Sequence, residues 1–209
     1  MPRRRSPRRR ASRKPRFRLQ RFPLLVVLVL VCVAWLPPAR HVAATQWDAL
    51  LHRREAREQA RRYGIDPDLA RAIAHAARSE GIDPELGFRL VRVESGFRER
   101  AVSPVGALGL TQLMPRTAAE LQPGITREQT FERDTNLRLG FRYLRWLLQI
   151  YDGDIEEALH AYNRGPGTVR RVRAAGRDPA NGYAERILGP YGPVQRYQGQ
   201  GFISAIARF

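Results

Sequence analysis

The chain has 209 residues, a length that accommodates one domain with a substantial core. Its formal net charge is +17, yet residues 1–44 hold twelve of the 37 basic residues and no acidic one. Residues 45–209 carry 25 basic and 20 acidic side chains, so the high isoelectric point does not by itself indicate a nucleic-acid-binding protein. Cys32 is the single cysteine, which excludes a disulfide within the chain.

The N-terminal residues have the layout of an export signal. A basic tail, residues 1–21, precedes the uncharged run FPLLVVLVLVCVAWLPPA at residues 22–39. This run is intermediate between a signal-peptide core and a membrane-spanning helix, so an uncleaved anchor and a peptide cleaved after Ala44 both fit. Because basic residues stay on the cytoplasmic side, we expect the chain from Gln46 onward to lie outside the cytoplasm.

After residue 45, apolar residues recur every three to four positions and alternating β-branched runs are absent, which predicts a mainly α-helical domain. Residues 45–72 begin with an arginine-rich segment that is expected to form a helical stalk or linker. The segments GIDPDLARAIAHAARSE at 64–80 and GIDPELGFRLVRVESGF at 81–97 repeat at a 17-residue period. Each begins with the Asp-Pro pair typical of a helix N-terminus, which predicts two successive short helices with similar packing faces.

Glu94 lies in the apolar run LVRVESGF, close to the end that Gly96 predicts for the second repeat helix. Apolar neighbours and the negative end of the helix dipole both disfavour a carboxylate, so both raise the pKa of this side chain. A carboxyl group that is protonated near neutral pH can act as a general acid. Ala77 occupies the same place in the first repeat, so the repeated helix does not require a glutamate there. These residues alone leave open a surface glutamate paired with Arg92 or Arg98.

The next segment, RAVSPVGALGLTQLMPRTAAEL at residues 100–121, predicts a glycine-containing loop and then a helix that begins at Pro115. The loop places a hydroxyl, an amide and a thioether group after the Glu94 helix, on Ser103, Gln112 and Met114. Such groups suit a sugar with N-acetyl substituents, although the same residue types are more often structural.

Further helices are predicted toward the C-terminus. Residues 134–151 have two apolar faces, which predicts a helix at the centre of the core. One face comprises Leu137, Phe141, Leu144, Leu148 and Tyr151, and the other comprises Tyr143, Trp146, Leu147 and Ile150. Residues 155–163, after Asp154, form a helix that ends in AYNRGPGTV (161–169), where a Gly-Pro-Gly turn begins another. NGYAERIL (181–188) predicts a last helix containing Tyr183.

Three blocks, VESGFRERAVSPVGALGLTQLMPRTA, AYNRGPGTV and NGYAERIL, occur in this order. With them, residues 73–197 resemble the catalytic domain of lytic transglycosylases of the soluble-transglycosylase (SLT) type, which is related to goose-type lysozyme. The resemblance implies a lysozyme-like helical fold whose groove binds the glycan strands of peptidoglycan. It also implies a reaction that needs no cofactor.

The resemblance assigns roles to individual residues. Glu94 matches the catalytic acid/base, which would protonate the glycosidic oxygen between MurNAc and GlcNAc and then accept the proton of the muramyl C6 hydroxyl. The product would be a 1,6-anhydromuramyl end. The matched substrate-binding and supporting positions are Ser103, Gln112, Met114, Ala161, Tyr162, Asn163 and Tyr183. Tyr183 is expected to hold the Glu94 carboxyl group, and Ser103 the acetyl group of the sugar.

Other functions fit parts of this pattern. The same site using water would be a muramidase, and the same fold without the reaction would be a peptidoglycan-binding module or a secretion-apparatus scaffold. The intact Glu94 disfavours a scaffold, and Glu85 and Glu99 are weak candidates for a second catalytic carboxylate.

The expected partners are the glycan strands and, through the N-terminal segment, the inner membrane. No nucleic acid is expected, because the main basic cluster precedes the apolar run. The histidines, at positions 41, 52, 75 and 160, lack ligand spacing, so no metal is expected. Residues 198–209 form a C-terminal tail to which the sequence assigns no role.

Overall fold

The structure is a computed structural model that describes residues 37–189, with side chains from Leu50 onward. The chain divides into two units, residues 1–49 and 50–209. In the first unit, residues 37–49 are helical and belong to α2 (Pro37–Tyr63). The predicted basic tail, most of the predicted apolar segment and the C-terminal tail lie outside the described residues. Within the described part of the chain, we find no helix with the length and hydrophobicity needed to cross a bilayer.

The second unit is helical, as the spacing of apolar residues predicts. Its further helices are α3 (Pro67–Ser79), α4 (Pro84–Ser95), α5 (Pro115–Leu121), α6 (Arg127–Phe131), α7 (Arg133–Ile150), α8 (Ile155–Arg164), α9 (Pro166–Ala174) and α10 (Tyr183–Leu188). In residues 37–189, β pairing is limited to two isolated bridges, Val102 with Leu108 and Leu108 with Leu113. The prediction of a mainly α-helical domain is therefore confirmed.

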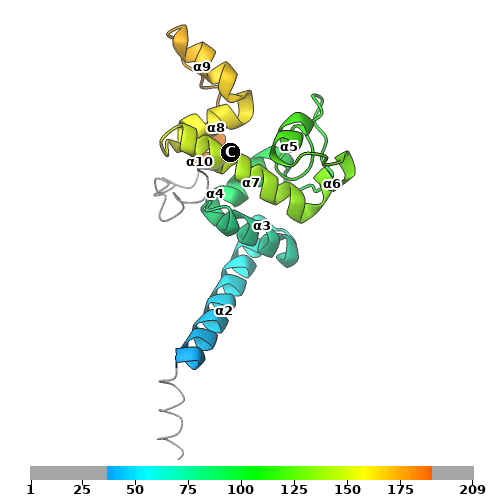
Figure 1. The fold of residues 1–209 in the computed structure, drawn as a ribbon, viewed down its shortest axis with the longest axis vertical. Helices are drawn as coiled ribbons and strands as arrows, with labels where there is room; N and C mark the ends of the chain where they lie inside the picture. Colours follow the sequence, from blue (N-terminus) through cyan, green and yellow to red (C-terminus); the bar gives the residue numbers. More distant parts are fainter. Residues whose placement is uncertain (1–36, 190–209) are drawn as a thin grey trace, which may run out of the picture. The chain divides into compact units, whose positions relative to one another are not determined.

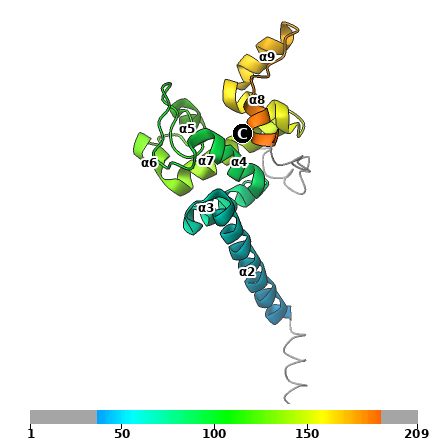
Figure 2. The same cartoon turned by 180° about the vertical axis from the view of Figure 1, so that it is seen from behind.

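Helix α7 is the central element of this unit. It packs against α3, α5, α6 and α8, while α4 packs against α3 and α10. In both views α5 and α6 lie on one side of α7, and α8 and α10 lie on the other (Figures 1 and 2). Leu137, Phe141 and Leu144 of α7 are fully buried in the main hydrophobic core, so the first predicted apolar face of this helix is confirmed.

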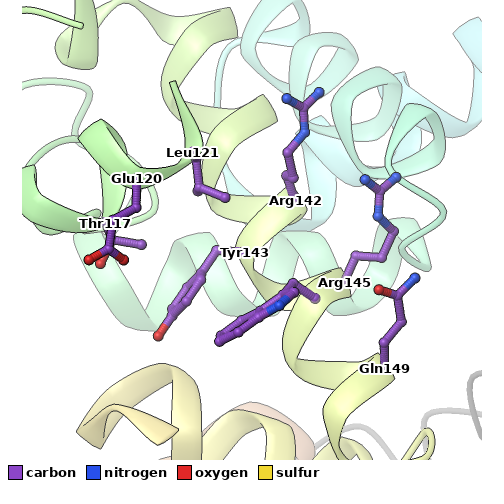
Figure 3. Close-up of a pocket in the computed structure, with 8 residues that line it drawn as sticks. Thr117, Glu120, Leu121, Arg142, Tyr143, Arg145 and Gln149 are labelled. Atoms are coloured by element: carbon purple, nitrogen blue, oxygen red, sulfur yellow. The ribbon is translucent and has the colours of Figure 1, made fainter. Parts of the chain in front are cut away.

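The second predicted apolar face of α7 is only partly in the core. Leu147 is buried, but Trp146 and Ile150 are 43% and 40% exposed, and Tyr143 is half-buried. The prediction was wrong for Trp146 and Ile150, whereas Tyr143 packs against the main core. Beside Trp146, the neighbouring helix α5 has only seven residues and leaves a pocket (Figure 3).

The helix starts of the 17-residue repeat are confirmed. The Asp66 side chain accepts hydrogen bonds from the amides of Asp68 and Leu69 at the start of α3, and Asp83 accepts one from Leu86 at the start of α4. The two helices differ in their environments, however. Ala77 is fully buried, and a Cβ atom added to Gly87 of α4 would lie 3.1 Å from its Cβ, so no glutamate would fit at Ala77.

The packed domain begins before the predicted boundary at residue 73. Ala60 of α2 and Leu69 and Ala70 of α3 are buried in the main core. Part of the segment predicted as a stalk, residues 45–72, therefore belongs to the hydrophobic core.

The loop between α4 and α5 is fastened to α7 by one buried side chain, that of Asn136. Its Nδ2 donates to the carbonyls of Leu108 (3.0 Å) and Thr130 (2.9 Å), and its Oδ1 accepts from the amide (2.8 Å) and hydroxyl (2.9 Å) of Thr111. Thr130 belongs to α6, a short helix that the sequence did not predict, although Thr126 and Gln129 form a capping box at its start. Every hydrogen-bonding atom of the Asn136 amide group is thus used to position neighbouring segments.

A substitution at Gly140 tests how closely the loop between α4 and α5 packs on α7. A Cβ atom at position 140 would lie 2.3 Å from Thr111 Oγ1, so Gly140→Ala must displace the loop. We expect the free energy of unfolding to fall by about 1–3 kcal/mol in urea denaturation of the full chain. Gly167→Ala in α9, where no atom lies within 4 Å of the added carbon, is the matched control and is expected to be neutral or stabilising by up to ~1 kcal/mol. Equal losses in both variants would contradict the close packing.

Candidate active site

Glu94 occupies the last turn of α4, where the sequence places it. The helix ends at Ser95, and Gly96 follows in the left-handed conformation with φ of 57°. The Glu94 side chain is half-buried. Among the described residues, the cation whose charge acts on this carboxyl group is Arg186 of α10, rather than Arg92 or Arg98.

Tyr183, the first residue of α10, donates a hydrogen bond from its hydroxyl to Glu94 Oε1. The turn before α10 aims this side chain: Gly182 has a φ of 79°, and Asn181 Oδ1 accepts from the Tyr183 amide at 3.2 Å. Tyr183 is only 1% exposed. Burial, followed by the negative charge of Glu94, raises the Tyr183 pKa well above its ordinary value, so the hydroxyl keeps its proton at neutral pH.

Burial raises the pKa of Glu94 from 4.5 to about 7. The hydrogen bond from Tyr183 and the positive charge of Arg186 both lower this pKa, but they offset burial only in part. The carboxyl group is therefore present in both protonation states near neutral pH, in the direction predicted from its apolar neighbours. A group in this condition can donate a proton and accept it back.

Tyr162 and Asn163 join the end of α8 to the same region. The Tyr162 hydroxyl donates to the Thr111 carbonyl at 2.9 Å, and burial together with the Glu94 charge raises its pKa well above the ordinary value. Asn163 is exposed, and its Oδ1 accepts from Asn181 Nδ2 at 2.8 Å, two residues before Tyr183. The AYN and NGY segments are thus connected by side chains.

Ala161 contributes through its backbone. The side chain is fully buried, and its carbonyl accepts the Gly165 amide at 2.9 Å, which closes the last turn of α8. This contact keeps Tyr162, the next residue, in a fixed helical position.

The predicted loop residues have partners within the loop itself. Ser103 Oγ accepts the Ala107 amide at 2.9 Å, and Gln112 Nε2 donates to the Gly109 carbonyl at 2.9 Å. Met114 is 41% exposed and immediately precedes α5. No hydrogen bond between described residues links Ser103, Gln112 or Met114 to Glu94, whereas Tyr183 is bonded to it directly.

The carboxylates closest to Glu94 in sequence are held by other partners. Glu85 accepts from Gln59 (3.1 Å), Tyr63 (3.2 Å) and Arg89 (2.9 Å), and Glu99 pairs with Arg133 at 2.5 Å. Within the described chain, no carboxylate is among the groups that shift the Glu94 pKa. In the same residues, no cluster of three histidine, cysteine or acidic side chains is placed to hold a metal ion.

Sequence reasoning missed Thr111, Asn136 and Arg186. Thr111 and Asn136 are both fully buried. The available sequence signal for this pair was the polar residue Asn136, which lies one helical turn before Gly140 and next to the apolar face of α7. Arg186 lies three residues after Tyr183, and its guanidinium carbon is 5.7 Å from the centre of that ring. This i, i+3 spacing on one short helix was the available signal for Arg186.

Tyr183→Phe is expected to raise the Glu94 pKa above 7, because it removes a hydrogen bond to the ionised form. A ¹³C NMR titration of the carboxyl carbon, assigned with Glu94→Gln, measures the shift. Tyr151→Phe removes a hydroxyl that does not act on Glu94 and should leave the pKa near 7. An unchanged or lower pKa in Tyr183→Phe would show that this hydroxyl does not stabilise the carboxylate.

The raised pKa also predicts how stability depends on pH. Between pH 4.5 and about 7 the folded state keeps a proton on Glu94 that the unfolded state has released, so the stability contribution of this group is full below pH 4.5 and is lost as pH rises to about 7. Glu94→Gln cannot ionise. We expect the unfolding free energy of the wild type, minus that of the variant, to fall across this interval by up to ~1.4 kcal/mol per pH unit. Urea titrations from pH 4 to 8 measure it, and a rising difference would refute the buried carboxyl.

Comparison with known proteins identifies the family. Residues 71–182 match the family model described as the Transglycosylase SLT domain. A soluble lytic murein transglycosylase of Salmonella typhimurium is 33% identical over 132 residues, which cover 57% of this chain and 20% of that protein. Membrane-bound lytic murein transglycosylase C of Cronobacter sakazakii is 31% identical over 122 residues, covering 52% and 34% respectively.

A solved structure of a lytic transglycosylase is also similar to this chain. The 70-kDa soluble lytic transglycosylase in complex with bulgecin A matches with a TM-score of 0.50 and 28% identity, over 56% of this chain and 22% of that one. The chain thus spans about a fifth to a third of the length of these relatives. The family match includes Glu94 and Tyr162, and the resemblance predicted from the three sequence blocks is confirmed. Because the family model covers more than half of its residues, the chain belongs to the Transglycosylase SLT domain family.

Proposed function

We propose that this protein is a lytic transglycosylase that cleaves the β-1,4 bond between MurNAc and GlcNAc in peptidoglycan and forms a 1,6-anhydromuramyl end. The main support for this proposal is the state of Glu94, a half-buried carboxyl group with a pKa of about 7 that accepts a hydrogen bond from the Tyr183 hydroxyl. The names of the relatives, which are lytic murein transglycosylases, support the substrate class.

The proposed reaction uses one proton twice. Protonated Glu94 donates to the bridging oxygen as the C1–O bond of MurNAc breaks, and the N-acetyl oxygen of that sugar stabilises the cationic carbon, as in substrate-assisted glycosidases. The C6 hydroxyl oxygen then bonds to C1, and its proton passes to the Glu94 carboxylate. The enzyme returns to its starting state, and no water is consumed.

The surroundings of Glu94 suit both halves of this cycle. Burial favours the protonated form that begins the reaction, whereas Tyr183 and Arg186 stabilise the carboxylate that follows the first transfer. A carboxyl group in water, with a pKa near 4.5, would hold too little proton at neutral pH to serve as the acid.

A single carboxyl group is consistent with the neighbouring contacts. Two-carboxylate glycosidases place a second acidic group opposite the first. Glu85 and Glu99 are both engaged with arginines, Arg89 and Arg133. The proposed mechanism needs neither of them, and it needs no metal or other cofactor.

The remaining predicted residues are proposed to bind or support the glycan. Because Ser103 Oγ accepts the Ala107 amide, its hydroxyl hydrogen can be donated to an acetyl carbonyl of the sugar. Tyr162 and Asn163 would form one wall of the site, while Gln112 and Met114 would form the loop side. Ala161 supports Tyr162 through the helix backbone.

We also propose that the enzyme works on the periplasmic side of the inner membrane. The basic tail at 1–21 and the uncharged run at 22–39 support this location, either as an anchor or as a signal cleaved after Ala44. A relative named as membrane-bound is consistent with anchoring.

Mass spectrometry of muropeptides released from purified peptidoglycan by the full chain tests the reaction. The wild type is expected to release anhydromuramyl products, and Glu94→Gln to lose about 10²–10⁴-fold in rate, the usual contribution of a general acid. Glu99→Gln, which removes a nearby carboxylate paired with Arg133, is the matched control and should retain activity.

The mass of the products separates the alternatives. Products one water heavier, with reducing ends, would mean a muramidase and overturn the anhydro product. Absence of products from both proteins, with retained sedimentation on peptidoglycan, would mean a binding module.

A further inference from the structure

Phe97, three residues after Glu94, has a backbone conformation that bulky residues avoid. Its φ is 65°, and the φ of Gly96 before it is 57°, so two consecutive residues after α4 are left-handed. Glycine adopts this conformation readily, whereas a bulky residue is held in it only where its surroundings leave no alternative. Strained residues of this kind gather at active sites, so the contacts of Phe97 are relevant to the position of Glu94.

Tyr63, the last residue of α2, packs against Phe97. The centres of the two rings are 5.5 Å apart and their planes make an angle of 61°, and both side chains are half-buried. The Tyr63 ring is also stacked on fully buried Phe88 of α4, with centres 5.4 Å apart and planes 8° apart. Aromatic pairs in such arrangements are favourable beyond the area that they bury. One ring of α2 thus contacts both α4 and the residue that follows its end.

The hydroxyl of Tyr63 is fixed at the start of α4. It donates to Glu85 Oε1 at 3.2 Å, and Glu85 also accepts from Arg89 at 2.9 Å and from Gln59 of α2 at 3.1 Å. Glu85 lies in the first turn of α4. Tyr63 is therefore joined to the beginning of the helix that carries Glu94 as well as to the residue beyond its end.

Tyr63 packs on a different side of α4 from the one that carries the carboxyl group. Phe88 and Glu94 are six positions apart on this helix, so their side chains point ~120° apart around its axis. The groups of the described chain that shift the Glu94 pKa are Tyr183 and Arg186, and Tyr63 is not one of them. An effect of Tyr63 on the carboxyl group therefore passes through the backbone of the last turn.

We propose that Tyr63 is a positioning residue for the reaction: its ring holds Phe97 in the left-handed conformation and thereby keeps the last turn of α4 where the Glu94 carboxyl group meets the Tyr183 hydroxyl. This inference rests on the proposed function, because it gives α2 a role in the same reaction. Without the ring, Phe97 leaves its strained conformation, the last turn of α4 frays, and water reaches Glu94.

The test is Tyr63→Leu in the full chain, which keeps an apolar side chain but removes the flat ring. Water at Glu94 removes the largest cause of its raised pKa, so this pKa is expected to fall from about 7 toward 4.5, by about one unit or more, in a ¹³C NMR titration. Less of the acid is then protonated at pH 7. We expect kcat on solubilised glycan strands to fall about fivefold or more, with KM changed by less than about twofold.

Tyr63→Phe is the conservative variant. It keeps both ring contacts and removes only the hydroxyl, while Glu85 retains its hydrogen bonds from Gln59 and Arg89. Both kcat and the Glu94 pKa should therefore stay close to their wild-type values. A loss in Tyr63→Phe as large as that in Tyr63→Leu would overturn the role of the ring.

Tyr151→Leu is the matched control. Tyr151, like Tyr63, is a half-buried tyrosine that packs against the main core, but it follows α7 instead of preceding α3. Its replacement is expected to lower the free energy of unfolding without changing kcat or the Glu94 pKa. Equal changes of kcat and pKa in Tyr63→Leu and Tyr151→Leu would mean a general loosening of the core and overturn the proposal.

Phe97→Leu removes the other ring of the pair. It is expected to lower kcat and the Glu94 pKa as Tyr63→Leu does, and it keeps the proposal testable if Tyr63→Leu does not fold. Because the two rings act together, the double variant should lose about as much activity as either single variant. Additive losses would show that Tyr63 does not act through Phe97.

Failure of this inference is distinguishable from failure of the proposed function. Anhydromuramyl products from the wild type, with unchanged kcat and Glu94 pKa in Tyr63→Leu, would reject the role of Tyr63 and leave the reaction in place. A lowered Glu94 pKa in Tyr63→Leu, without anhydromuramyl products from the wild type, would reject the reaction and keep the role of Tyr63 in positioning Glu94.

Discussion

The buried amide group of Asn136 is the constraint on which the rest of the site depends. It forms hydrogen bonds with the carbonyls of Leu108 and Thr130 and with the amide and hydroxyl of Thr111. These four groups, which are buried away from water, therefore each have a hydrogen-bond partner. Once Thr111 is held, its own carbonyl accepts the Tyr162 hydroxyl and orients α8. A loop of irregular backbone thereby connects α7 and α8 through hydrogen bonds.

The second requirement is a balance of opposing effects at Glu94. Burial alone would make the carboxyl group a weak acid that rarely ionises, and full exposure would leave it ionised at neutral pH. The Tyr183 hydroxyl and the Arg186 charge lower the Glu94 pKa, but they offset the effect of burial only in part. Both residues come from α10, a helix of six residues, so a short element sets the protonation state of a residue on α4.

Features that depend on neighbours in sequence were predictable. The Asp-Pro starts of α3 and α4, the end at Gly96 and the starts of α5 and α8 follow from local hydrogen bonding and backbone geometry. The contact between Tyr183 and Glu94 was predicted only through family resemblance. Three features depend on which helices pack together: the charge of Arg186 at Glu94, the hydrogen bonds of Asn136 and the exposure of Trp146. Helical periodicity in the sequence does not predict which helices pack together.

The distance in sequence between Glu94 and Tyr183, 89 residues, has a consequence for the order in which the site is assembled. A nascent or partly translocated chain that has folded only as far as α8 contains the acid but neither of the groups that stabilise its ionised form. In such a chain Glu94 lacks the Tyr183 hydrogen bond and the Arg186 charge, and the packing of α10 on α4 is also missing, so its pKa is not yet that of the folded domain. The protonation balance at Glu94 is therefore a property of the completed domain and arises only when α10 packs against α4.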